Sequence, residues 1–166
     1  GSPAGYALDN GAYGAFLRGS GFDDDAFLWA VESIGERADF VVIPDTVADR
    51  DATLSQADSW FDRLSGLRLM LAVQDGMHIS DIEPWFDRGV GVFVGGSTTW
   101  KLRTMNSWCK AAKSAGTKSH IGRVNTVKRI RMCQYAGADS FDGTSVTRYS
   151  CNIHRLDSAL RQGCLF

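Results

Sequence analysis

Long apolar runs are absent from this sequence. A helix that spans a membrane needs about 18 consecutive apolar residues, and no stretch of the chain approaches that length. The apolar content of 44% and the charged content of 22% are ordinary for a folded globular protein. We therefore expect a folded domain that has no membrane partner.

Metal-binding patterns of cysteine and histidine are missing too. The four cysteines are spaced by 24, 18 and 13 positions, without a C-x-x-C pair, and the three histidines are scattered. This pattern argues against a zinc site and favours reduced thiols in a cytoplasmic compartment. We expect no metal and no other cofactor. The residues concerned are Cys109, Cys133, Cys151, Cys164, His78, His120 and His154.

Lysine is absent from the first 100 residues, which leaves the charge unevenly distributed. Residues 1–100 carry 6 basic and 16 acidic side chains, a net charge of −10, whereas residues 101–166 carry 12 basic and 3 acidic ones, a net charge of +9. A positive face of this kind is a candidate for binding a polyanion. Solvated helix faces would give the same composition, so charge alone leaves both interpretations open.

Short apolar runs alternate with helical patterns along the chain. This alternation predicts a parallel sheet that is buried on both faces, in an α/β fold. The predicted strands are 6–9, 40–45, 69–74, 90–94, 118–122 and 138–142, and the predicted helices are 26–31, 52–64, 79–88, 98–115, 126–135 and 152–161. We expect residues 10–14 to form a glycine-rich turn.

A polar residue or a glycine follows every predicted strand. An open sheet places its ligand at one switch point, whereas all strand ends of a barrel converge on one mouth. The pattern therefore favours a TIM-type (β/α)8 barrel, formed as a single domain over residues 1–166. Such a barrel has eight strands and six are visible, so we expect two units to precede residue 1. A reduced opening segment or an open sheet would also fit.

Asp142 stands at the end of the last predicted strand, directly before a glycine turn. Enzymes with α/β folds place reactive groups at such strand ends. A carboxylate at this position is suited to trap a sugar covalently when a glycosidic bond breaks through an oxocarbenium-like transition state. A capping residue or a salt-bridged acid would occupy the same position.

The strand-end segments together resemble the tRNA-guanine transglycosylase superfamily. They are most similar to its short phage branch, the DpdA-like proteins that place 7-deazaguanines into DNA. The segments are Leu8-Asp9-Asn10-Gly11-Ala12, Pro44-Asp45, Ala72-Val73-Gln74-Asp75-Gly76, Val94-Gly95-Gly96-Ser97, His120-Ile121-Gly122-Arg123-Val124-Asn125 and Ser140-Phe141-Asp142-Gly143-Thr144. The resemblance runs from Tyr6 to about Arg155 and implies a barrel that exchanges a base without a cofactor.

The resemblance implies Asp142 as the nucleophile and Asp9 as the carboxylate that carries a proton between the leaving and incoming bases. Asp9 also precedes Asn-Gly, so it could simply form a turn. Asp45 and Gln74 would read the base edge, and Gly95, Gly96 and Gly122 would let the base approach closely. Gly95-Gly96-Ser97 before a helix could instead cradle a phosphate, which would favour a lyase or isomerase for a sugar phosphate.

Basic residues near the last strand ends, together with one asparagine, are the expected nucleic-acid contacts. They are Lys101, Arg103, Arg123, Lys128, Arg129, Arg131 and Arg148, with Asn125 available for a phosphate. Trp100, Tyr13 or Tyr149 could stack on a base or belong to the core, and His120 could hydrogen-bond at the mouth or only pack there.

The chain has no counterpart of the family's C-terminal zinc site, so we expect DNA rather than tRNA as substrate. A 7-deazaguanine base would be the co-substrate, and a homodimer is possible. The cytoplasm is the expected location, or the host cytoplasm if a phage encodes the chain. A tRNA-guanine transglycosylase or a non-catalytic nucleic-acid-binding barrel would also agree with this resemblance.

Overall fold

The computed structural model describes residues 5–143. Its strands are β1 (Ala7–Leu8), β2 (Phe40–Val42), β3 (Leu69–Val73), β4 (Gly91–Val94), β5 (Ser119–Ile121) and β6 (Ser140–Phe141). Its α-helices are α1 (Ala12–Arg18), α2 (Asp24–Ile34), α3 (Arg50–Arg63), α4 (Glu83–Phe86), α5 (Thr98–Ser114) and α6 (Val127–Ala136), and two 3₁₀ turns are η1 (Gly35–Arg37) and η2 (Ile79–Asp81).

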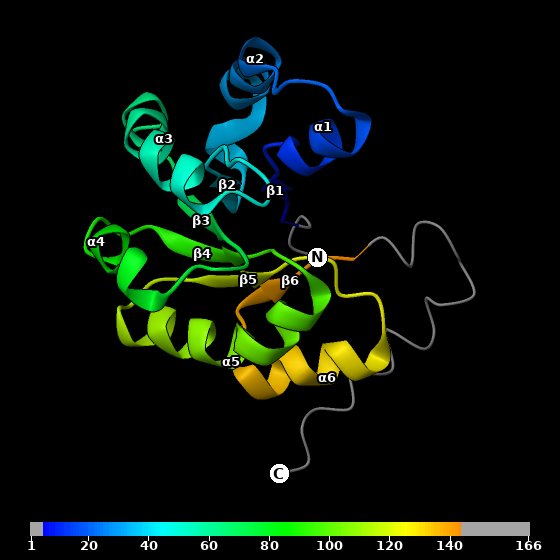
Figure 1. The fold of residues 1–166 in the computed structure, drawn as a ribbon. Coiled ribbons are helices and arrows are strands. Elements are labelled where there is room, and N and C mark those ends of the chain that lie inside the picture. Colours follow the sequence, from blue (N-terminus) through cyan, green and yellow to red (C-terminus); the bar gives the residue numbers. More distant parts are fainter. Residues whose placement is uncertain (1–4, 144–166) are drawn as a thin grey trace.

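The six strands form one parallel sheet in the order of the chain, β1-β2-β3-β4-β5-β6. Each strand pairs with the next, and the sheet curls into a half-barrel. In Figure 1 the helices follow the outer side of this curl, from α2 through α4 to α5 and α6. The predicted α/β class and parallel sheet are confirmed, and a closed eight-stranded barrel stays a prediction.

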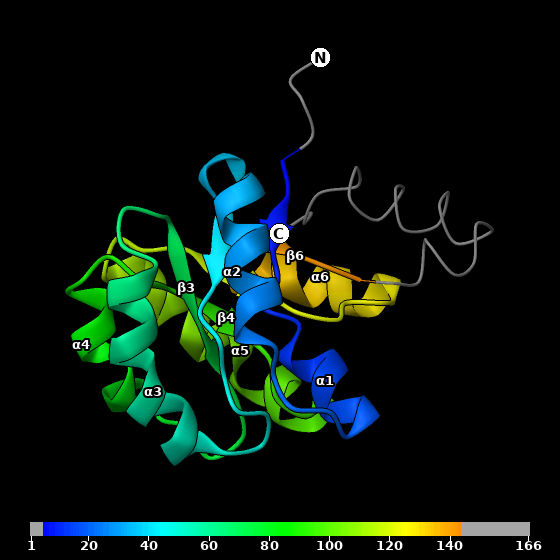
Figure 2. The same ribbon diagram turned by 90° about the horizontal axis from the view of Figure 1, so that it is seen from above.

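The two faces of the sheet bury different side chains, because successive residues of a strand point to opposite faces. The convex face packs against the helices through residues such as Val41, Leu71 and Val92. The concave face carries a smaller apolar cluster of Phe40, Val42, Met70 and Ala72, with Phe93 packed against it. Figure 2 shows the helical layer around the sheet from above.

Four of the helices begin at a side-chain cap. The side chains of Asp23, Asp49, Ser97 and Thr126 each accept a hydrogen bond from the backbone N–H three residues further on. Such caps satisfy N–H groups that have no partner inside the helix. They fix the starting points of α2, α3, α5 and α6, and therefore the loops that connect these helices to the preceding strands.

The prediction for residues 10–14 was wrong, because helix α1 begins at Ala12. The turn is confined to Gly11, whose φ of +78° suits glycine, and Gly14 is simply included in the helix. The helix buries only small residues, Ala12 and Ala15, and exposes its large apolar side chains. The sequence of α1 therefore lacks the stripe of large buried side chains by which a helix that faces the core is recognised.

Two further expectations concern the second half of the chain. The single helix predicted at 79–88 is two short turns, η2 and α4, with Pro84 at the start of α4. The helix predicted at 152–161 lies outside the described residues. Within residues 5–143, no helix is long and apolar enough to cross a bilayer.

Candidate active site

The carboxyl ends of the strands bring Asp9, Asp45 and Asp142 together at one edge of the half-barrel. Asp9 follows β1 directly and Asp142 follows β6 directly, and Asp45 lies shortly after β2. The three carboxylates also interact electrostatically, because the charge of Asp142 acts on Asp9 and the charge of Asp9 acts on Asp45. The two edge strands of the described sheet thus supply both acids that the sequence predicted to be catalytic.

A cavity of about 690 Å³ follows the concave face toward this edge. Most of its walls come from the amino ends of the strands, including Asp39, Phe40 and Lys118. His120 lines its middle, and Asp142 lies at its far end. Asp142 therefore faces an open space, and its side chain keeps 47% of its surface exposed. Asp9 and Asp45 do not line this cavity.

Asp142 is held by two hydrogen bonds. The backbone N–H of Arg123 donates to Oδ1 at 2.9 Å, and Nε2 of His120 lies 3.1 Å from Oδ2. Partial burial raises the pKa of Asp142, but these hydrogen bonds and the positive charge of Lys101 outweigh it and bring the pKa below its ordinary value. Asp142 is therefore ionised near neutral pH, as a carboxylate nucleophile must be.

The pKa of Asp9 shifts in the opposite direction. Loss of hydration raises the pKa of Asp9, and the negative charge of Asp142 adds to the effect, although backbone N–H groups of Gly11 and Asn10 oppose it. The side chain still reaches solvent. Two neighbouring acids with divergent pKa values are suited to different tasks, one as an anion and one as a proton carrier.

Asp45 is tied to the β1 end by Asn10, a residue that the sequence analysis did not single out. The Asn10 amide donates to the Ile43 carbonyl and to Oδ1 of Asp45, each at 2.9 Å, and its oxygen accepts from the Ala12 N–H at 2.8 Å. Burial raises the pKa of Asp45, the Asn10 bond lowers it, and the charge of Asp9 raises it, with a net rise. The position of Asn10 directly after Asp9 was the available signal.

Gln74 is buried, and its amide is occupied by the loop between β2 and α3. Its Nε2 donates to the Thr46 carbonyl at 2.9 Å and to Oγ1 of Thr53 at 3.0 Å, and its Oε1 accepts from the Ala48 N–H at 2.7 Å. Both N–H groups are thus used within the protein. This geometry does not fit the expected contact with a base, and it gives Gln74 the task of holding the loop that carries Asp45.

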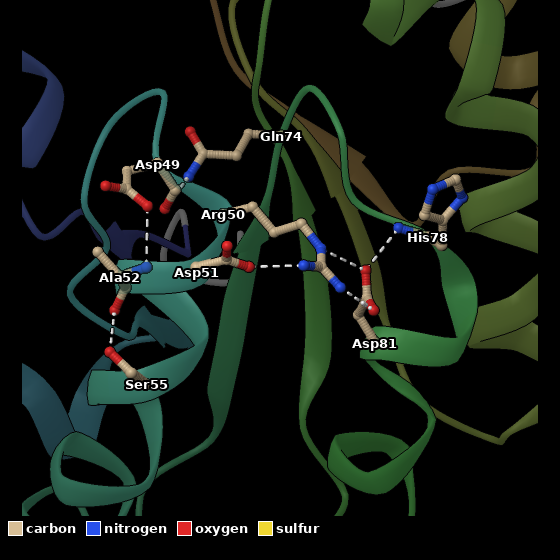
Figure 3. A network of polar contacts seen from close by, with 8 residues as sticks. All are labelled: Asp49, Arg50, Asp51, Ala52, Ser55, Gln74, His78 and Asp81. Atoms are coloured by element: carbon tan, nitrogen blue, oxygen red, sulfur yellow. Dashed lines mark hydrogen bonds and ion pairs between the residues drawn. The ribbon is translucent and has the colours of Figure 1, made fainter.

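The same loop is anchored further along by Arg50 (Figure 3). Its guanidinium makes a bidentate ion pair with Asp81, with Nε 3.0 Å from Oδ2 and Nη2 2.6 Å from Oδ1. Asp81 also accepts from the His78 N–H at 2.8 Å. Bidentate pairs fix orientation as well as distance. These contacts connect the start of α3 to the segment after β3.

The Gly95-Gly96-Ser97 turn is already occupied by an internal carboxylate. Asp75 accepts from the Ser97 N–H at 2.5 Å and from the Ser97 hydroxyl at 2.6 Å. Partial burial raises the pKa of Asp75, but the two Ser97 hydrogen bonds, the N–H of Asp75 itself and the charge of Arg103 together bring it below its ordinary value. An anion cradle whose N–H is already taken by Asp75 does not favour a sugar-phosphate substrate.

Lys101 is 1% exposed and donates from Nζ to the Gly122 carbonyl. Burial lowers the pKa of Lys101 to about 8, and the charge of Arg123 contributes in the same direction. A side chain at this depth does not fit the expected contact with a phosphate. Its position instead supports the β5 end beneath Gly122, where an added Cβ would lie 2.9 Å from the Phe93 ring.

Arg123 connects three parts of the mouth. Its backbone holds Asp142, its guanidinium donates to the Gly96 carbonyl, and the same group lies 4.6 Å above the ring of Tyr13 on α1. Its φ of +60° is unusual for a residue with a side chain. These contacts use the guanidinium inside the site and distinguish Arg123 from the surface cations.

The other expected nucleic-acid contacts lie on α5, α6 and the loop before α6. Arg103, Lys128 and Arg131 are exposed, and Asn125 and Arg129 are half-buried. Trp100 is only 8% exposed and belongs to the core, whereas Tyr13 remains 43% exposed. Arg148 and Tyr149 lie outside the described residues.

No family model matches the chain, and no curated protein matches it. Among residues 5–143, no cluster of three or more histidine, cysteine or acidic side chains is arranged to hold a metal ion. The groups that the described residues bring to the mouth are the carboxylates, His120 and the backbone N–H groups around them.

Proposed function

We propose that the protein is a DNA-guanine transglycosylase, which exchanges guanine in DNA for a 7-deazaguanine base. The observation that carries the proposal is the pair of carboxylates at the two edge strands, whose pKa values move in opposite directions. The pKa of Asp142 is lowered from its ordinary value, and the pKa of Asp9 is raised. A double displacement at a sugar carbon needs one ionised nucleophile and one acid that exchanges a proton.

In the proposed reaction the Asp142 carboxylate bonds to C1′ of the target nucleotide as the bond from C1′ to guanine breaks. Protonated Asp9 supplies the proton that the departing guanine takes. The incoming 7-deazaguanine then gives its N9 proton to Asp9 and attacks C1′, and the bond to Asp142 breaks. Atoms and charge balance over the cycle, and the enzyme returns to its starting state.

Recognition of the base is assigned to Asp45 and to the backbone of Gly96, since the Gly95 N–H already donates to the Val73 carbonyl at 2.9 Å. An ionised Asp45 can accept from the ring N–H and the exocyclic amine of a guanine-like base. Gln74 acts indirectly, because its amide is engaged in shaping the Asp45 loop. Gly122 leaves no space for a side chain between itself and Phe93.

A polymeric substrate is supported by the exposed cations of α5 and α6. Arg103, Lys128 and Arg131 are placed to meet phosphates, which position a strand without reading its sequence. A base within duplex DNA has to leave the stack to reach the mouth. Tyr13, exposed beside Arg123, is suited to stack on such a base.

The direct test is base exchange measured by mass spectrometry of nucleosides. The protein is incubated with labelled guanine or 7-deazaguanines and with single-stranded DNA, duplex DNA or tRNA. We expect incorporation into DNA by the unmodified chain and a loss of at least about a thousandfold in Asp142→Ala, since removal of a covalent nucleophile costs on this order. A covalent protein–DNA adduct on denaturing gels should disappear in the same variant.

Asp139→Ala is the matched control. Asp139 precedes the same strand, but it lies at its amino end, where it pairs with Lys118 at 2.8 Å. It should retain exchange. Undiminished exchange in Asp142→Ala would refute the nucleophile assignment. Exchange into tRNA alone would favour the tRNA enzyme, and DNA binding without exchange or adduct would favour a binding protein.

A further inference from the structure

His120 occupies the centre of the concave face, where the sequence analysis left its role open. It is 5% exposed and lies between two aromatic rings, with ring centroids 5.0 Å from Phe40 and 4.9 Å from Phe93. The Phe93 contact is a parallel stack, with 19° between the planes. Rings on two sides restrict the turning of the imidazole and hold its edge toward β6.

Both nitrogens of His120 have partners on β6 or directly after it. Nδ1 lies 2.8 Å from Oγ of Ser140 and Nε2 lies 3.1 Å from Oδ2 of Asp142. The register explains this arrangement, because His120 pairs with Ser140 across the two strands. Ser140 and Asp142 are two residues apart, so both side chains point to the same face as His120.

The chemistry of the three groups fixes the direction of the hydrogen bonds. An ionised Asp142 only accepts, so Nε2 of His120 must carry the hydrogen. In the neutral imidazole Nδ1 is then an acceptor, and the Ser140 hydroxyl is the donor to it. The ionised Asp142 therefore selects the neutral tautomer of His120 that carries its hydrogen on Nε2, and the Ser140 hydroxyl supplies the donor that Nδ1 needs in this tautomer.

We propose that Ser140 and His120 are positioning residues that form a relay to Asp142, in which the serine hydroxyl donates to Nδ1 of the histidine and the histidine Nε2–H orients the carboxylate. The relay rests on the proposed role of Asp142 as nucleophile. Together with the Arg123 N–H on the other oxygen, it fixes the plane of the carboxylate from two sides. A carboxylate fixed in this way is oriented for attack before the substrate arrives.

A purely structural His120 would also pack between Phe40 and Phe93, so the test needs variants that separate packing from hydrogen bonding. Ser140→Ala removes only the hydroxyl, and Ser140→Thr restores it. His120→Phe keeps a ring in the stack and removes both hydrogen bonds. His120→Gln gives up the ring and keeps an N–H close to the position of Nε2.

The first readout is nuclear magnetic resonance of the unmodified protein and the variants, without substrate. In the unmodified protein the nitrogen shifts of His120 should show one tautomer, with the hydrogen on Nε2. Ser140→Ala should keep the hydrogen on Nε2, shift the Nδ1 resonance because its donor is lost, and raise the pKa of the Asp142 carboxyl because the remaining Nε2–H is a weaker donor. Ser140→Thr should restore both the Nδ1 shift and the pKa. The other groups that act on Asp142 are the charges of Asp9 and Lys101 and the backbone N–H of Arg123, and none of them changes in the Ser140 variants.

The second readout is base exchange. We expect Ser140→Ala to lower kcat by up to about tenfold with an unchanged KM, because one hydrogen bond between neutral groups supports an effect of this size. His120→Phe should lower kcat further, and His120→Gln should recover part of the loss. Thermal melting of His120→Phe close to that of the unmodified chain would show that packing is preserved.

An unchanged Nδ1 resonance and an unchanged Asp142 pKa in Ser140→Ala would overturn the relay. Because the resonance experiment needs no substrate, this failure is separate from a failure of the proposed function. If the relay signals change as expected while the unmodified protein exchanges no base, the proposed function is wrong and the coupling of Ser140, His120 and Asp142 stands.

Discussion

Gly96 forms the turn between β4 and α5 with a φ of +66°, and its surroundings leave no space for a methyl group. A Cβ added there would lie 2.6 Å from Oδ2 of Asp75, 2.9 Å from the Trp100 ring and 3.1 Å from the Asp75 backbone nitrogen. The ring and the backbone nitrogen cannot move aside easily, and the Asp75 carboxylate is held by Ser97. We therefore expect Gly96→Ala to be strongly destabilising.

The magnitude has two parts. A left-handed backbone costs about 1–2 kcal/mol for a residue with a side chain, and steric overlap in a well-packed place adds about 1–3 kcal/mol. Gly137→Ala isolates the first part, because Gly137 has a φ of +74° and no atom within 4 Å of its added Cβ. Both substitutions restrict the unfolded chain equally, so their difference reports the overlap alone.

Urea unfolding of the two variants at equal protein concentration measures this difference. We expect Gly137→Ala to lose about 1–2 kcal/mol and Gly96→Ala to lose about 2–5 kcal/mol relative to the unmodified chain. The slopes of unfolding free energy against urea concentration should be equal in the two variants, so that their midpoints report stability alone. Equal losses in the two variants would refute the close contact between Gly96, Asp75 and Trp100.

Three further predictions concern charge. The pKa of Asp45 is raised above 3.8 in the folded chain, so above this pH the folded chain holds a proton that the unfolded chain has released, and the unmodified protein loses stability. Asp45→Asn removes this loss and should therefore gain stability relative to the unmodified chain as the pH rises. Urea midpoints at about pH 3 and pH 7 check this. Between about pH 8 and pH 10.5 the unfolded chain holds the Lys101 proton that the folded chain has lost, so the free energy of unfolding should rise there, and less in Lys101→Met. Lys128→Ala should reduce the slope of log DNA affinity against log salt by about 0.9 without favouring any DNA sequence.

Much of the frame of the site was predictable from the sequence. Apolar runs of the right length locate parallel strands, and parallel strands deliver their carboxyl ends to one edge. The proximity of Asp9 and Asp142 was expected on that ground, although they are separated by most of the described chain. Helices α3, α5 and α6 were also predicted to within a few residues, since their caps and apolar faces are local signals.

The tasks of individual polar residues were less predictable. The sequence positions of Gln74 and Lys101 predicted contacts with a ligand. In the structure Gln74 instead binds the loop after β2, and Lys101 is buried beneath the end of β5. Such partners depend on loop paths that no periodicity encodes. His120 was ambiguous for the same reason, because its two partners come from the next strand and its stacking rings come from β2 and β4.

The strictly sequential order of the six strands has a consequence for how the protein folds. Each strand docks beside the one made just before it, so every new unit finds its neighbour already present as the chain leaves the ribosome. Domains assembled from such near contacts avoid the large loop-closure cost of distant pairing. Asp142 follows the last of these strands, so its carboxylate meets His120 only after β5 is in place. The nucleophile of the proposed reaction is thus the last part of the described chain to acquire its geometry.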